Sequence, residues 1–235
     1  MRLHRFLCEQ DLIGPVLRLE DEKLLHQWIR VLRYAPGQQV LLCNGRGLEV
    51  RATLLRCSGT SAELQVEETI LEDKPPVPAL TLCFSLLKRE HTELVLEKGT
   101  ELGVSVFQPI LCARTVKEGL NIARAKRILC EAMEQSGRRW LPELREVVEF
   151  SNILKRIPAH QGYFASLTTD SVERRNEESV VSSIETRSLF IGPEGGWTPE
   201  EEGLAKEHGL KFISLSKQVL RAETACLAGV VLLLQ

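Results

Sequence analysis

A short proline-rich segment limits what this chain can fold into more than any other feature. The sequence Lys-Pro-Pro-Val-Pro-Ala at 74–79 has three prolines within four positions. Proline has no backbone N–H and restricts the residue before it, so this segment cannot continue a helix or a central strand. It therefore predicts an extended linker, with one domain at 1–73 and a second at 80–235.

The residues before the linker are typical of a small antiparallel β-barrel. Short apolar or alternating runs occupy 39–43, 48–55 and 62–66, and glycine-containing turn signals separate them. One helix is expected at 20–33. Its apolar face comprises Leu24, Leu25, Trp28, Ile29 and Leu32.

The residues after the linker alternate between strand and helix patterns. Strands are expected at 80–86, 104–111, 162–167, 188–191 and 212–215. Helices are expected at 90–102, where Gly103 would cap the end, at 121–137 and at 223–234. A further helix begins with the capping box Thr-Pro-Glu-Glu at 198–201. Such alternation predicts an α/β domain with a mostly parallel sheet.

Charge and cysteine content narrow the functional classes. The net charge of -2 is unlike most RNA-binding proteins, but residues 114–145 hold eight Lys or Arg against four Glu, so a basic face is possible. The seven cysteines are widely spaced without a C-x-x-C pair, which disfavours both a disulfide framework and a zinc site.

Two observations predict a cytoplasmic protein. The N-terminal residues lack the apolar core of a signal peptide. The apolar run at 225–234 has ten residues, whereas a membrane span needs about 20.

A glycine-rich loop is the first candidate for ligand binding. The sequence Ile-Gly-Pro-Glu-Gly-Gly-Trp occupies 191–197, after an expected strand and before the capping box. A ligand can approach glycine backbone closely because there is no Cβ. The same loop would also serve as a plain strand-to-helix connection, and both interpretations remain open at this point.

Two further segments carry suitable polar groups. Residues 215–225 place Arg221 and Glu223 directly before a fully apolar stretch, where they would act either in binding or as a helix cap with an ion pair. The expected helices at 90–102 and 121–137 carry polar residues that would also suit a solvated face: Glu97, Lys98, Glu101, Glu131 and Gln135.

Together these segments resemble a known family. They are similar to the N3-methyluridine methyltransferases of 16S ribosomal RNA, a branch of the SPOUT superfamily. The matching motifs are K-x-T-E-L-G-V at 98–104, E-x-x-x-Q-S-x-R at 131–138, G-P-E-G-G at 192–196 and L-R-x-E-T-A at 220–225. Arg5-Phe6 and Val-Leu-Arg at 31–33 also match the family's small RNA-binding domain.

The resemblance implies a PUA-like β-barrel domain followed by an α/β methyltransferase domain with a C-terminal trefoil knot. It also implies three loops that converge on S-adenosylmethionine. The cofactor-binding residues that it implies are Leu167, Ile191, Gly192, Pro193, Gly195, Gly196, Leu215, Ser216 and Leu220. The family usually has a glycine at the position of Ser216.

The resemblance further implies methylation of uridine N3. This nitrogen carries a proton in neutral uracil, so the proton must be lost or the anionic form of the base must be stabilised. Arg221 is the candidate for binding a carbonyl oxygen of the base, and Glu223 is the candidate for holding Arg221 or for accepting the proton. The arginines expected to bind RNA phosphates are Arg2, Arg5, Arg30, Arg33, Arg46, Arg114 and Arg138. A homodimer is expected because the helix at 223–234 is apolar nearly all round and SPOUT relatives are dimers.

Two other functions stay open from the sequence. A SPOUT methyltransferase acting on another ribosomal or transfer RNA site would keep the cofactor loops and change its RNA surface. A non-catalytic RNA-binding module would not need the loop at 192–196. A Rossmann-type methyltransferase is disfavoured, since no glycine-rich turn follows the strand at 80–86.

Overall fold

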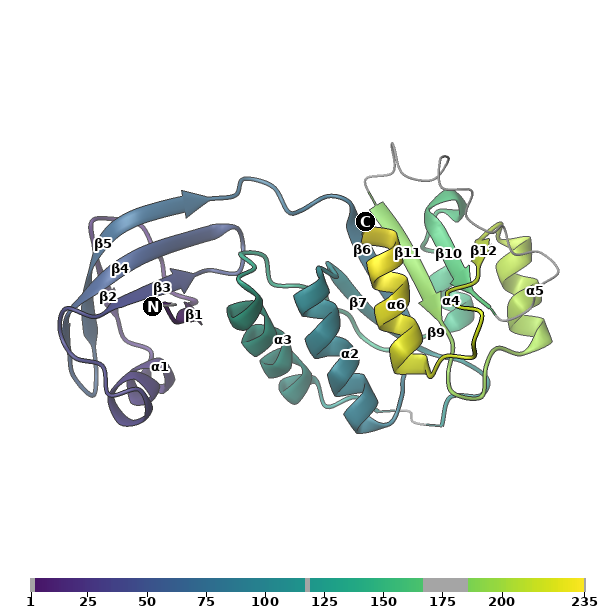
Figure 1. Cartoon of the computed structure of the whole chain (residues 1–235), viewed down its shortest axis with the longest axis horizontal. Coiled ribbons are helices and arrows are strands. Elements are labelled where there is room, and N and C mark those ends of the chain that lie inside the picture. The colour runs from purple at the N-terminus through teal and green to yellow at the C-terminus, as the bar shows by residue number, and fades with distance from the viewer. Residues whose placement is uncertain (1–2, 117–118, 167–185, 235) are drawn as a thin grey trace. The chain divides into compact units, whose positions relative to one another are not determined.

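The computed structural model describes residues 3–116, 119–166 and 186–234 (Figure 1). The chain divides into two compact units. The first unit is Met1–Pro75 together with Met133–Leu141, and the second is Pro76–Ala132 together with Pro142–Gln235. The sequence thus passes from the first unit to the second within the proline-rich segment, and it returns once to the first.

A five-stranded sheet forms the first unit. Its strands are β1 (Arg5–Leu7), β2 (Val16–Leu19), β3 (Gln39–Cys43), β4 (Leu48–Cys57) and β5 (Ala62–Leu71), in the order β1-β3-β4-β5-β2. β1 runs parallel to β3, and the other neighbours are antiparallel. The antiparallel pairing of the three strands expected at 39–66 is confirmed.

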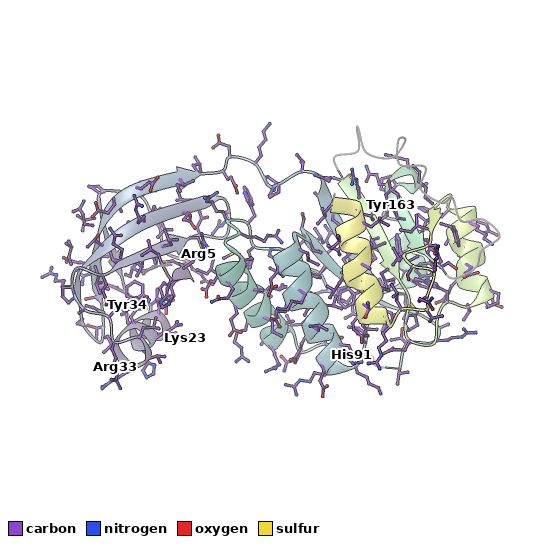
Figure 2. The ribbon with its side chains drawn as sticks, viewed as in Figure 1. Arg5, Lys23, Arg33, Tyr34, His91 and Tyr163 are labelled. Carbon is purple, nitrogen blue, oxygen red and sulfur yellow. The ribbon has the colours of Figure 1, made fainter. Side chains whose placement is uncertain are left out.

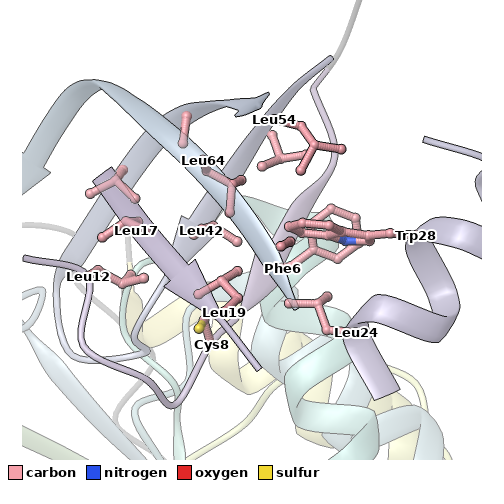
Figure 3. Close-up of a cluster of buried hydrophobic side chains, with 14 of the residues drawn as sticks. Phe6, Cys8, Leu12, Leu17, Leu19, Leu24, Trp28, Leu42, Leu54 and Leu64 are labelled. Atoms are coloured by element: carbon pink, nitrogen blue, oxygen red, sulfur yellow. The ribbon is translucent and has the colours of Figure 1, made fainter. Parts of the chain in front are cut away.

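The core of the first unit lies between this sheet and one helical segment (Figure 3). The segment consists of α1 (Glu22–His26), which Asp21 caps, and a π-helical continuation, η1 (Gln27–Val31). Trp28 is fully buried and packs edge-on against Phe6, with ring centroids 5.4 Å apart. Leu24 and Leu25 are buried beside it, as the apolar face at 20–33 predicted.

A buried carboxylate joins distant parts of the first unit. Glu49 on β4 is 2% exposed. Its oxygens lie 2.5 Å from the Arg5 guanidinium and 3.4 Å from that of Arg139. A buried charge is tolerated when it is paired, so these two arginines offset the cost of burying Glu49. Glu134 adds a second link, because it accepts a hydrogen bond of 2.7 Å from the backbone N–H of Leu7.

The second unit contains a sheet in which every pairing is parallel. Its strand order is β12-β10-β11-β6-β7-β8, and β9 also pairs with β7. The strands are β6 (Ala79–Ser85), β7 (Val106–Leu111), β8 (Glu143–Leu144), β9 (Val148–Glu149), β10 (Gly162–Ala165), β11 (Thr186–Ile191) and β12 (Lys211–Ile213). The parallel α/β sheet expected from the alternating pattern is confirmed.

Helices lie on both faces of the parallel sheet. They are α2 (Arg89–Leu102), α3 (Ile122–Ser136), α4 (Phe150–Leu154), η2 (Ala159–Gln161), α5 (Pro199–Glu207) and α6 (Ala222–Leu234). α6 packs against α2, β6 and β11. Phe150 of α4 and Ala205 of α5 share a buried cluster with Phe164 and Phe190 from the strands, on the other face. No helix in the described ranges is long and apolar enough to cross a membrane.

The short elements β1, β2, β8, β9, α4 and η2 were not expected from the sequence. β8 and β9 have two residues each, too few for an alternating pattern to show. β7 begins at Val106 rather than at 104, because Gly103 adopts a left-handed conformation at the end of α2 and Val104 still bonds to that helix.

The cysteine thiols take part in packing. Cys8, Cys43, Cys83, Cys112 and Cys226 are buried, and all seven are free. Burial raises the pKa of Cys43 and of Cys112 to about 12. These thiols therefore stay protonated and unreactive at neutral pH.

Gly229 sets how closely α6 approaches the sheet. A Cβ at this position would lie 2.5 Å from Leu189 Cδ2 and 3.4 Å from Leu215 Cδ2. Leu189 is completely buried, so it has little room to move. Gly203 in α5 offers a contrast, because a Cβ there would meet no atom within 4 Å.

We predict opposite effects of alanine at these two helical glycines. Gly229→Ala should lower the free energy of unfolding by about 1–3 kcal/mol, because overpacking a full core is costly. Gly203→Ala should raise it by up to about 1 kcal/mol, because alanine favours the helix. Urea denaturation measures both, and equal shifts in the two variants would contradict the packing argument.

Candidate active site

A cavity of about 770 Å³ opens at the carboxyl ends of four parallel strands. The residues that end or follow β6, β10, β11 and β12 form most of its wall, at 86–88, 165–166, 191–197 and 215–216. β6 lies between β7 on one side and β11 on the other, so the order of strands reverses here. Ligands of open α/β sheets bind at such a reversal, outside the carboxyl ends of the strands.

The loop after β11 is held in place by Trp197. Its indole N–H donates a hydrogen bond of 2.9 Å to the carbonyl of Ala165, at the end of β10. The ring packs on Phe164, with centroids 4.4 Å apart. A Cβ on Gly192 would lie 2.9 Å from the Trp197 ring, so the ring can fold back over the loop only because residue 192 is glycine.

Arg114 holds the same loop from the other side. Its guanidinium donates hydrogen bonds of 2.9 Å and 3.1 Å to the carbonyls of Gly195 and Trp197. Glu201 reinforces this connection, because one carboxylate oxygen accepts from the backbone N–H of Ala113 at 2.8 Å while the other closes the capping box with Thr198. Arg114, predicted to bind RNA phosphate, thus has a structural contact that the sequence did not show.

The loop after β12 contains Ser216, where the resembled family usually has glycine. Its hydroxyl accepts a hydrogen bond of 3.0 Å from the backbone N–H of Gln218. Among the described residues, Arg33 is the one non-glycine residue with a positive φ. Ser216 therefore fits this loop without backbone strain, and its side chain stabilises the turn.

Arg221 and Glu223 stand at the start of α6 and differ in their surroundings. Both line the cavity, but Arg221 is exposed whereas Glu223 is 7% exposed. Within the described ranges the two side chains form no ion pair. The Glu223 carboxylate instead faces His91 from α2, with Oε2 and Nδ1 3.5 Å apart.

The structure brings most of the predicted cofactor-binding residues together. Those that line the cavity are Ile191, Gly192, Pro193, Gly195, Gly196, Leu215, Ser216 and Leu220. Leu167 lies outside the described residues. The segments predicted as candidate polar faces on α2 and α3 do not contribute Glu97, Lys98, Glu101, Glu131 or Gln135 to this wall.

Several cavity residues were missed by the sequence analysis. His91 and Lys88 come from the start of α2, and Val116 follows β7. Ser166 donates a hydrogen bond of 2.8 Å to Glu202 across the cavity wall. No local pattern marks these residues, because only the folded sheet brings their segments to the loops at 191–197 and 215–223.

The predicted RNA-binding arginines are in three different situations. Arg30, Arg33 and Arg46 are exposed in the first unit. The Arg5 guanidinium pairs with the buried Glu49, and burial lowers the pKa of Arg138. Arg114 contacts the loop after β11, as described above. Arg2 lies outside the described residues.

Known proteins resemble this chain in both sequence and fold. A family model described as an RNA methyltransferase domain matches residues 73–234. Ribosomal RNA small subunit methyltransferase E from Synechocystis is 34% identical over 86% of this chain and 67% of its own length. The enzyme of the same name from Bacillus subtilis is 29% identical over 90% and 87%, respectively.

This chain belongs to the ribosomal RNA small subunit methyltransferase E family. Solved structures agree with that assignment. The methyltransferase E from Neisseria gonorrhoeae bound to S-adenosyl methionine superposes with a TM-score of 0.84 at 28% identity, covering 98% of this chain and 96% of that one. A methyltransferase from Legionella pneumophila in complex with S-adenosyl methionine gives 0.85 at 27% identity, covering 99% and 97%.

The residues that match the RNA methyltransferase domain model also contain the cavity. The matched residues, 73–234, include every residue that lines it. The loops after β11 and β12 therefore lie in the domain that this family member shares with other RNA methyltransferases.

We predict that Arg114 keeps the loop after β11 rigid. Arg114→Ala removes two hydrogen bonds, and each contributes about 0.5–1.5 kcal/mol. Amide hydrogen exchange at residues 194–197 should then become roughly tenfold faster. The control is Arg127→Ala, which removes an exposed arginine paired with Glu131. Unchanged exchange in Arg114→Ala would show that Trp197 alone holds the loop.

Proposed function

We propose that this protein transfers a methyl group from S-adenosylmethionine to N3 of a uridine in 16S ribosomal RNA. The cavity at the carboxyl ends of β6, β10, β11 and β12 is the observation that carries the proposal. Its wall combines the loop at 191–197 with Arg221 and Glu223, in a chain that belongs to a family of ribosomal RNA methyltransferases. A ribosomal RNA substrate also favours the cytoplasm as its location.

The cavity fits S-adenosylmethionine in size and in chemistry. A volume of about 770 Å³ is ample for a ligand of this kind. Ile191, Leu215 and Leu220 supply apolar walls, and a Cβ on Gly196 would point into open space. The backbone of the loop at 191–197 can therefore contact the adenosine closely. When bound, the cofactor supplies a methyl group activated on a sulfonium.

Arg221 is positioned to act on the base. Uracil N3 carries a proton, and removal of that proton places negative charge on the neighbouring carbonyl oxygens. An exposed guanidinium at the cavity wall can donate hydrogen bonds to such an oxygen and stabilise the anion. Since Glu223 does not occupy this guanidinium within the described ranges, Arg221 remains available to the substrate.

The proposed domains are an RNA-holding domain at 1–73, a linker at 74–79 and a methyltransferase domain at 80–235, of which residues 133–141 pack with the first unit. The five-stranded sheet of the first unit is compatible with a PUA-like barrel. The trefoil knot of the SPOUT fold is proposed for the C-terminal end of the second unit. This proposal rests on the methyltransferase E relatives and on the position of α6 against β6 and β11.

The reaction is tested on small ribosomal subunits, naked small-subunit RNA and transfer RNA from cells that lack this protein. Purified protein with labelled S-adenosylmethionine should produce N3-methyluridine, which nucleoside analysis identifies. Methylation of another nucleoside, or of transfer RNA alone, would favour the alternative SPOUT target. Absence of any transfer would favour a non-catalytic RNA-binding module.

We predict that Arg221→Lys slows the chemical step. Lysine keeps the charge but loses the planar arrangement that donates to two acceptors. Single-turnover methylation should fall about 10²-fold, as when one oxyanion donor is removed. Affinities for RNA and S-adenosylmethionine should change little. A wild-type rate with a lowered melting temperature would instead assign Arg221 a structural role.

The arginines of the first unit should separate into two groups. Replacing the exposed Arg30 and Arg46 with alanine should weaken RNA binding and lower its salt slope by about 0.7–0.9 per lost phosphate contact. Arg5→Ala should chiefly lower the free energy of unfolding, by about 1–3 kcal/mol or more, since Glu49 loses its nearest partner. Fluorescence titrations at several salt concentrations and urea melts distinguish the groups.

A homodimer through the second unit is also proposed. Leu94 and Leu102 of α2 and Val231 of α6 are exposed, although α2 and α6 pack together. These exposed apolar side chains on two packed helices are the ones that a second copy would cover. Light scattering at micromolar concentration should give twice the chain mass of 26.5 kDa. Leu94→Glu together with Val231→Glu should give the monomer mass.

A further inference from the structure

The Glu223 carboxylate is an unusual feature of the cavity wall. It is 7% exposed, and its Oε2 atom has no hydrogen-bond partner in the described part of the chain. Glu223 lies in the first turn of α6, where the helix dipole favours a negative charge. The helix dipole does not donate a hydrogen bond to Oε2, and burying a carboxylate oxygen without such a bond costs free energy. Glu223 Oε2 is therefore a strong hydrogen-bond acceptor that needs a donor from a neighbouring side chain.

His91 is the side chain placed to supply that hydrogen. It lies in the first turn of α2, which packs against α6 (Figure 2). Its Nδ1 atom is 3.5 Å from Glu223 Oε2, is buried and likewise has no hydrogen-bond partner among the described residues. This separation is longer than a formed hydrogen bond. Active-site hydrogen bonds are often long before substrate binds and shorten in the complex.

The other side of the His91 ring is available to a ligand. The side chain is 32% exposed and lines the cavity, although Nδ1 itself is buried. The accessible part is thus the remainder of the side chain, which includes Nε2. A carboxylate that accepts from Nδ1–H fixes the tautomer, so that Nε2 carries a lone pair and can accept a proton. The other charged groups on the cavity wall are Lys88, Glu194, Glu202 and Arg221.

We propose that His91, oriented by Glu223, is the base that removes the N3 proton of the target uracil. This assignment rests on the proposed uridine methylation. The N3–H bond breaks and the proton passes to Nε2. The electron pair left on N3 forms the new bond to the methyl carbon, and the pair of the broken carbon–sulfur bond leaves with sulfur. The resulting imidazolium is stabilised by Glu223, which is therefore a positioning residue.

This assignment divides the work between two side chains. Arg221 is exposed at the cavity wall and stabilises the charge on the uracil oxygens, while His91 receives the proton. Glu223 is itself less suitable as the base, because its carboxylate is almost completely buried behind the imidazole. Cationic His91 binding the cofactor carboxylate is the competing role, and it predicts a loss of cofactor affinity instead of a loss of rate.

The test compares wild type, His91→Ala, His91→Gln and Glu223→Gln, with His160→Ala as a control. His160 is an exposed histidine of the second unit that does not line the cavity. Calorimetry measures S-adenosylmethionine binding to each protein. Single-turnover formation of N3-methyluridine is measured with saturating small ribosomal subunits, with and without added imidazole.

Both His91 variants should bind S-adenosylmethionine within about threefold of wild type while the single-turnover rate falls at least about 10²-fold, as expected for loss of a general base. Imidazole should restore part of the rate in His91→Ala, because the small alanine side chain leaves space for it. It should restore none in Glu223→Gln, which still has its own imidazole. His160→Ala should match wild type throughout. Circular dichroism checks folding, and His91→Gln preserves most of the side-chain volume if the smaller alanine loosens the packing of α2 against α6.

Two results would overturn the proposal while leaving the proposed function intact. One is a wild-type rate in both His91 variants, and the other is a loss of rate that saturating cofactor fully restores. Absence of N3-methyluridine from the wild-type reaction is distinguishable from both. That result would overturn the proposed function, and the assignment of His91 with it.

Discussion

The parallel direction of every pairing in the second sheet is the constraint on which the site depends. The carboxyl ends of parallel strands all lie at the same end of the sheet. Each connection therefore starts there and crosses over to the opposite end, where the next strand begins. With β6 placed between β7 and β11, the chain turns to opposite sides of the sheet on leaving β6 and β11. The segments after four strands thus meet at one cavity, although they span more than a hundred residues of sequence.

The loops at this edge are stiff for identifiable reasons. Trp197 attaches the loop after β11 to the end of β10, and Arg114 attaches it to the segment after β7. Ser216 closes a turn in the loop after β12 with its own hydroxyl. A backbone that already has its binding shape loses little entropy when a ligand arrives, so these contacts favour affinity as well as order.

Local patterns predicted the parts of the fold that depend on local chemistry. The alternating strands and helices gave the parallel sheet, and the glycines at 192–196 marked the loop that lines the cavity. His91 was missed because an isolated histidine in an amphipathic helix carries no signal, and its meaning comes from Glu223, which lies far along the chain. The pairing of Arg5 with Glu49 was missed for the same reason, since a sequence pattern shows charge but not its partner.

The return of Met133–Leu141 to the first unit bears on how the chain folds during synthesis. The ribosome releases the N-terminus first, and N-terminal domains generally fold as they emerge. Here Glu49 acquires Arg139 as its second partner only after the chain has been made well into the second unit. The first unit therefore cannot complete this charge pairing when synthesis has reached only the proline-rich segment. The first unit thus finishes folding only after part of the second unit has been synthesised, even though its N-terminal residues emerge first.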